Sequence, residues 1–127
     1  MKPFVAFFVC FSLIATAASA LAGPRLKPLM RQWKSEVARA EPMLAGAAPY
    51  DEAELRRVMN GFVADTQEIE AGLAGHSAEA AAFKGRFAQF RADAADVLAS
   101  LASREAARGK FARLRRECAG CHDVFAN

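Results

Sequence analysis

Two cysteines and a histidine near the C-terminal end of the chain have the types and spacing that could do chemistry. The stretch Cys118-Ala119-Gly120-Cys121-His122 places the two thiols three residues apart and an imidazole directly after the second thiol. On a helix, residues three and four apart lie on the same face, so Cys118 would share a surface with Cys121 and His122. This pattern indicates covalent haem attachment, in which the thiols add to the porphyrin's vinyl groups and the imidazole ligates the iron.

Two other chemistries use paired cysteines, and the sequence argues against both. A structural zinc ion needs four ligands, and outside the motif only the distant His76 is of that kind once the N-terminal cysteine is removed. A dithiol redox site of the thioredoxin kind needs a strand-rich βαβ setting, and nothing in this chain has the pattern of a strand. The sequence therefore predicts one covalent haem, with Cys118 and Cys121 as its thioether residues and His122 as the proximal iron ligand.

Residues 1–20 have the features of a secretion signal that is removed. Lys2 precedes the apolar stretch 4–15, and small residues follow up to a cleavage site after Ala20, with Ala22 as the alternative. The apolar core is shorter than the about 20 residues that span a membrane, although an uncleaved anchor remains the alternative. Removal would also take away the third cysteine. We expect a periplasmic protein that is not attached to a membrane once the signal is removed.

The composition of residues 21–127 indicates a single all-α domain. Loss of the signal lowers the formal net charge from +3 to +2, which is too close to neutral to indicate a nucleic-acid partner. Ala, Leu, Glu and Arg are abundant and favour helices, whereas the strand formers Val, Ile, Thr and Tyr are scarce. The length is that of one domain.

Apolar residues recur at alternating steps of three and four in four successive stretches, with Thr66 filling one step. The stretches are Leu26, Met30, Trp33, Val37, Ala40 and Leu44; Leu55, Met59, Phe62, Thr66, Ile69 and Leu73; Phe83, Phe87, Phe90, Ala94, Val97 and Leu101; and Phe111, Leu114, Cys118, Cys121 and Phe125. An average step of 3.5 residues is typical of helices that pack at about 20° to one another. The pattern predicts an antiparallel up-down-up-down four-helix bundle.

Turn and capping residues separate the first two stretches. Residues 46–50 form a turn, and Asp51 is a good N-cap with Glu54 at the position that completes a capping box. Tyr50 and Leu55 occupy the positions of a hydrophobic staple. A helix therefore begins after Asp51.

The later boundaries depend on fewer signals. Gly72 and Ser77 mark a helix end and a new N-cap with a short loop between them. The last boundary is expected at Ser103, because Arg104 and Arg108 occupy the next two positions of the stripe, where a continuing core needs apolar residues. One helix running through both of the last stretches is the alternative.

A haem motif at the C-terminal end of the last helix of a small exported four-helix bundle resembles the class II cytochromes c, which include cytochrome c′ and its low-spin relatives. The resemblance is carried by the tail 118–123, the turn 46–51 and Phe111 seven residues before Cys118. It covers nearly all of the chain after the signal, and the haem motif is its most specific part. It implies one haem c, redox partner proteins and a homodimer.

The resemblance also concerns the second axial position of the iron. In cytochrome c′ an apolar residue of the first helix covers this position without ligating, and the iron binds small gases; in the low-spin relatives a methionine ligates there. Counted back from the turn 46–51, the corresponding residue is Met30, so Met30 is expected as the distal ligand. Met30 could instead only pack in the core, and Met43, Met59 and His76 are the alternative ligands.

The expected function is electron transfer, with binding of NO or CO at an open iron as the alternative. Two protein ligands keep the iron site nearly unchanged on reduction, which lowers the cost of adding an electron. No acid, base or nucleophile cluster indicates an enzyme. The stripe residues expected near the haem, where they would keep it in a low-dielectric pocket, are Trp33, Phe62, Phe87, Phe90 and Leu114.

Three arginines lie beside the attachment motif. Arg113, Arg115 and Arg116 could guide an acidic redox partner toward the haem. The alternative is a solvated face whose charge is favourable near a helix C-terminus.

Overall fold

The computed structural model describes residues 26–73 and 77–125, with side chains described as far as His122. The expected signal segment 1–20 and the candidate ligand His76 lie outside the described residues. Four helices are present: α1 (Leu26–Ala45), α2 (Glu52–Gly72), α3 (Ala78–Ser100) and α4 (Arg104–Phe125). These described ranges contain no strand, which confirms the prediction of an all-α chain with four helices.

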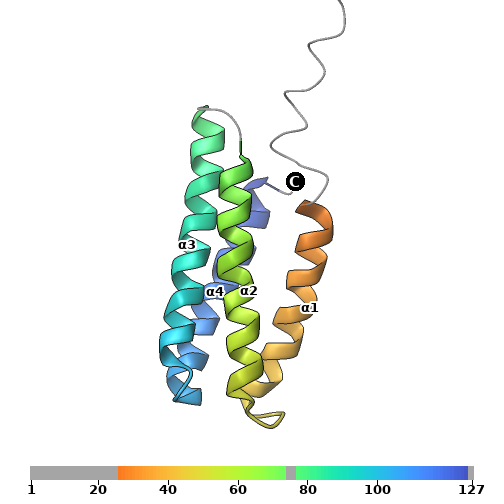
Figure 1. Ribbon diagram of the computed structural model, residues 1–127, viewed down its shortest axis with the longest axis vertical. Helices are drawn as coiled ribbons and strands as arrows, with labels where there is room; N and C mark the ends of the chain where they lie inside the picture. Colours follow the sequence, from red (N-terminus) through yellow and green to blue (C-terminus); the bar gives the residue numbers. More distant parts are fainter. Residues whose placement is uncertain (1–25, 74–76, 126–127) are drawn as a thin grey trace, which may run out of the picture.

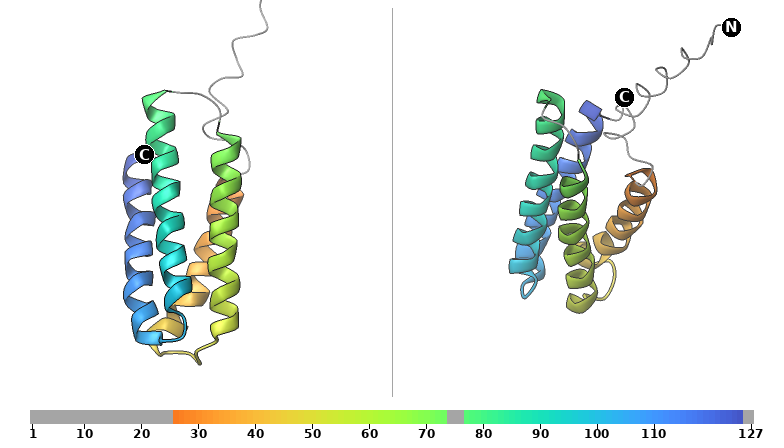
Figure 2. Two further views of the ribbon diagram at one scale, coloured as in Figure 1. Left: turned by 60° about the vertical axis from the view of Figure 1, so that its left-hand side comes forward. Right: turned by 45° about the horizontal axis from the view of Figure 1, so that its top comes forward.

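The helices lie side by side, as in a four-helix bundle (Figure 1). α3 packs closely along both α2 and α4, whereas α1 is near the others at its C-terminal end and diverges from them toward Leu26 (Figures 1 and 2). The Leu26 end of α1 and the C-terminal end of α4 lie at the same end of the molecule (Figure 1). None of the described helices is apolar over enough of its length to cross a bilayer.

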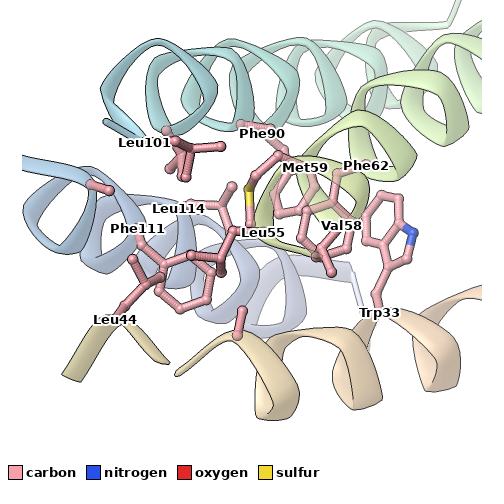
Figure 3. Close-up of a cluster of buried hydrophobic side chains, with 14 of the residues drawn as sticks. Trp33, Leu44, Leu55, Val58, Met59, Phe62, Phe90, Leu101, Phe111 and Leu114 are labelled. Carbon is pink, nitrogen blue, oxygen red and sulfur yellow. The ribbon is translucent and has the colours of Figure 1, made fainter. Parts of the chain in front are cut away.

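The four stretches of regularly spaced apolar residues, called stripes here, form the core. Side chains from all four helices converge there (Figure 3), and all six members of the third stripe are buried. The largest side chains that are less than 2 % exposed are Phe62, Leu44, Leu55, Met59, Leu101, Leu114, Val97, Thr66 and Asp93. Leu26, Met30 and Val37 are only partly buried, in keeping with the divergence of α1. The core is therefore complete at one end of the bundle and open at the other.

The predicted N-caps are confirmed. The side chains of Asp51, Ser77 and Ser103 each accept a hydrogen bond from the backbone N–H three residues later, at 3.0, 3.1 and 3.3 Å. Each bond satisfies a donor that the first turn of a helix leaves without an intrahelical partner. The Glu54 carboxylate, expected in a capping box, binds the guanidinium group of Arg57.

The turn between α1 and α2 is fixed at both of its ends. Gly46 has φ +82°, and the N–H of Ala47 donates to the carbonyl of Pro42 at 2.9 Å, which is the helix-ending arrangement that favours glycine. The Tyr50 hydroxyl donates to the Leu101 carbonyl at 2.6 Å. This bond joins the turn to the C-terminal end of α3.

The boundary between α3 and α4 is confirmed near Ser103. Arg104 and Arg108 are exposed, and the buried Ala107 continues the core of α4 instead. The Arg104 guanidinium lies over the first turn, since a Cβ added at Gly46 would lie 3.1 Å from its Nη1 atom. The two turns at this end of the molecule therefore contact each other.

Candidate functional site

A pocket opens at the end of the molecule where α1 diverges, between side chains of α1, α3 and α4. It is lined by Met30, Trp33, Arg86, Phe87, Phe90, Glu117, Cys118, Cys121 and His122. The empty space between these side chains is about 350 Å³, and this figure includes space that is open to solvent. The fold thus brings the three motif residues together with Met30, although about ninety positions of sequence separate them.

The helix α4 continues through the motif to Phe125. Cys118 and Cys121 are therefore one helical turn apart on one face, and both are free thiols that are partly buried. His122 is exposed at the edge of the same pocket. One turn of α4 presents all three groups to the pocket.

Both thiols are held in the protonated form. Burial raises the pKa of Cys118 to about 11, and the nearby Cys121 adds to the shift in the same direction. Burial also raises the pKa of Cys121, against the opposing effect of the Arg86 guanidinium. Because the thiolate is the reactive form, these cysteines are weak nucleophiles at neutral pH in this fold.

Aromatic rings form the inner wall of the pocket. The ring of Trp33 stacks on Phe90 with centroids 4.7 Å apart and an interplanar angle of 9°. Phe62 meets each of these rings edge-on at 5.3 Å, and Phe87 meets Trp33 at 6.3 Å. The indole Nε1–H donates to Oδ2 of Asp65 on α2 at 2.8 Å. The wall is therefore fixed by contacts from three helices.

The role of Asp65 was not predicted from the sequence, although Trp33 indicates that an acceptor for its indole N–H is needed. A buried indole N–H needs an acceptor, and Trp33 is only 6 % exposed. The sequence does not say which carboxylate supplies the acceptor, because Asp65 is 32 positions away on another helix. The acceptor is found only once α1 and α2 are placed side by side.

A charged pair borders the pocket beside the thiols. Nη1 of Arg86 on α3 lies 3.7 Å from Oε2 of Glu117 on α4. A Cβ added at Gly120 would lie 3.4 Å from Nη1 of Arg86, which is an ordinary van der Waals contact. A small side chain at the second variable position of the motif would therefore touch the guanidinium without a clash. The sequence alone did not indicate this pair.

Met30 is the only one of the described methionines that lines the pocket. Met59 is 0 % exposed and Met43 is 7 % exposed, and both pack in the core. Leu114, which was expected near the site, is also fully buried in the core. Among the described methionines, Met30 is therefore the one that could act as a ligand in the pocket without a rearrangement of the core.

Two of the three arginines beside the motif are neutralised. Arg113 lies 3.3 Å from the buried Asp93 and 2.9 Å from Asp96. Arg115 forms an ion pair with Glu41 of α1. These ion pairs favour the interpretation that the three arginines belong to a solvated face of the protein, and they argue against a role of the arginines in guiding a partner.

Zinc binding finds no further support in the part of the chain described. There, no group of three or more His, Cys, Asp or Glu side chains is placed to hold a metal ion. The pocket instead combines two thiols, an imidazole and a thioether with apolar walls.

Comparisons with protein-family models, with curated proteins and with solved structures gave no match for this chain.

Proposed function

We propose that this chain is an electron-transfer protein of the class II cytochrome c type, with one covalent haem c in an antiparallel up-down-up-down four-helix bundle. Residues 1–20 direct its export to the periplasm and are removed in that process, and the protein acts as a carrier, not as an enzyme. The observation that supports this most is the pocket that Met30 lines together with Cys118, Cys121 and His122.

The donor groups in the pocket suit a haem. The thiols of Cys118 and Cys121 would form the two thioether bonds, since one helical turn separates them on one face. His122 follows on the same face and would be the proximal iron ligand. Met30 lines the pocket from α1 and would supply the second axial ligand.

A bound haem supplies a one-electron redox centre. The aromatic wall of Trp33, Phe87 and Phe90 keeps water from one side of the pocket, and a dry, apolar surrounding favours the less charged, reduced form. The Met30 thioether is a soft donor that also favours ferrous iron. It would occupy the position that an external ligand such as CO needs.

The visible spectrum of the purified protein tests the proposed ligation. The oxidised protein should be low-spin, with the weak far-red band of a sulfur-to-iron bond. Met30→Ala should lose this band and bind CO when reduced, whereas the matched core variant Met43→Ala should keep it. A high-spin wild-type protein that binds CO would contradict Met30 ligation and favour a gas-binding protein.

A further inference from the structure

The N-terminal half of α1 carries a basic stripe, which consists of Lys27, Arg31 and Lys34. Steps of four and three residues place these side chains on one face of the helix, and all three are exposed. No acidic residue occurs among residues 26–35. Within the residues that the structure describes, none of the three forms an ion pair. Their charge is therefore uncompensated.

The basic stripe lies next to residues that line the pocket, because Arg31 follows Met30 and Lys34 follows Trp33. Seven residues after Lys34, on the same face of α1, Glu41 forms an ion pair with Arg115, so this face is turned toward α4. Seven residues after Arg115, on the same face of α4, is His122, which lines the pocket. The Leu26 end of α1 and the C-terminal end of α4 lie at one end of the molecule (Figure 1). The basic stripe and His122 therefore border one opening.

Other cations near the pocket contribute less to the local field. Arg86 is paired with Glu117, and Arg115 is paired with Glu41. Exposed charges more than about 8–10 Å apart are largely screened at physiological salt. Lys84 and Arg116 also form no ion pair within the described residues, but only the basic stripe adjoins Met30 and Trp33, the residues of α1 that line the pocket.

We propose that the basic stripe is the docking surface for an acidic redox partner protein. The proposal rests on the proposed function, and one electron would pass from the reduced partner to the oxidised protein. An acidic patch laid against Arg31 and Lys34 would lie beside Met30, close to the pocket, and complementary charge would steer the encounter. A membrane is the weaker occupant, because the apolar face of α1 is turned into the bundle and leaves little to insert.

Zero-length cross-linking with a carbodiimide locates the docking surface with or without a haem. The probe is a flavodoxin, an acidic one-electron carrier. The chain after the signal has four lysines, namely Lys27, Lys34, Lys84 and Lys110. Flavodoxin carboxylates should couple to Lys27 and Lys34, and high salt should abolish this coupling. Equal coupling to Lys110 would overturn the proposal.

Matched charge reversals test whether the basic stripe acts in electron transfer. Arg31→Glu with Lys34→Glu should slow reduction of the loaded protein by flavodoxin about tenfold at low salt and remove the salt dependence. Arg108→Glu with Lys110→Glu changes the net charge equally at exposed positions early in α4, and should alter the rate less than about twofold.

Equal effects of the two pairs would mean that only net charge matters, and would refute the docking surface. A second refuting result is binding of the wild-type protein to phosphatidylglycerol vesicles that Arg31→Glu with Lys34→Glu abolishes, with no change in the rate with flavodoxin. A chain without haem would refute the proposed function and the redox role of the partner, whereas the cross-linking result would still decide whether the basic stripe docks an acidic protein.

Discussion

The hydrogen bond from Trp33 to Asp65 should decide how firmly the pocket end of α1 is held. Trp33 is the most N-terminal buried residue of α1, and its indole Nε1 lies 2.8 Å from Oδ2 of Asp65. Asp65→Ala leaves this N–H without its acceptor, and an unsatisfied buried donor costs about 1–3 kcal/mol. Because the bond is only part-buried, the lower part of that range, about 1–2 kcal/mol, is expected.

Thermal unfolding followed by far-UV circular dichroism measures this cost. A loss of about 1–2 kcal/mol corresponds to a fall in Tm of about 5–10 °C for a domain of this length. Asp65→Asn keeps an amide oxygen as acceptor and should lose about half as much. In the loaded protein, Asp65→Ala should also weaken the far-red band, because it loosens the segment that carries Met30. If Asp65→Ala were as stable as the wild type, the anchoring role of this bond would be refuted.

Three other perturbations have definite expected outcomes. Tyr50→Phe removes the hydrogen bond to the end of α3 and should lower the free energy of unfolding in urea by about 1 kcal/mol; an unchanged value would contradict its role. Hydrogen bonds from Arg57 and a second arginine hold the pKa of Glu54 at about 2, below its ordinary 4.5. The contribution of Glu54 to the free energy of unfolding is thus present above pH 4.5 and lost as the pH falls toward 2. Glu54→Gln should therefore make the free energy of unfolding depend less on pH between 4.5 and 2. An unaltered pH dependence would argue against the ion pair of Glu54 with the two arginines. In the haem-free protein at pH about 7.5, iodoacetamide should modify Cys118 and Cys121 more slowly than in the urea-unfolded chain, because burial raises both pKa values; equal rates would be inconsistent with buried thiols.

The helices and their boundaries were predictable because each depends on local sequence. The third stripe, from Phe83 to Leu101, is buried at every predicted step, since the helical period alone determines which side chains share a face. Asp51, Ser77 and Ser103 cap as expected because capping needs only a side-chain oxygen and the next three residues.

The buried charge of the core could not be predicted in this way. Asp93 is 2 % exposed, and its neighbour in space is Arg113 of α4. A carboxylate in a helix is ordinarily exposed, and only a cation on a different helix makes its burial tolerable. Such a pairing depends on the tertiary arrangement, which the spacing along one helix does not contain.

The candidate site was predictable in part. The thiols and the imidazole follow from the motif, and Met30 was selected by resemblance, because its spacing is equally that of a core residue. That Met30 and the motif line one pocket depends on the divergence of α1, and the pairing of Arg86 with Glu117 depends on the packing of α3 against α4. Ligation of iron by Met30 and His122 stays a prediction.

The intact mass of the exported protein, measured after unfolding in acidic organic solvent, tests the covalent haem most directly. Expression in a host that matures c-type haem proteins should give the mass of residues 21–127 plus one haem. Cys118→Ala with Cys121→Ala should give the polypeptide mass alone. If the wild-type protein from this host also had only the polypeptide mass, covalent haem attachment and the function proposed from it would be contradicted.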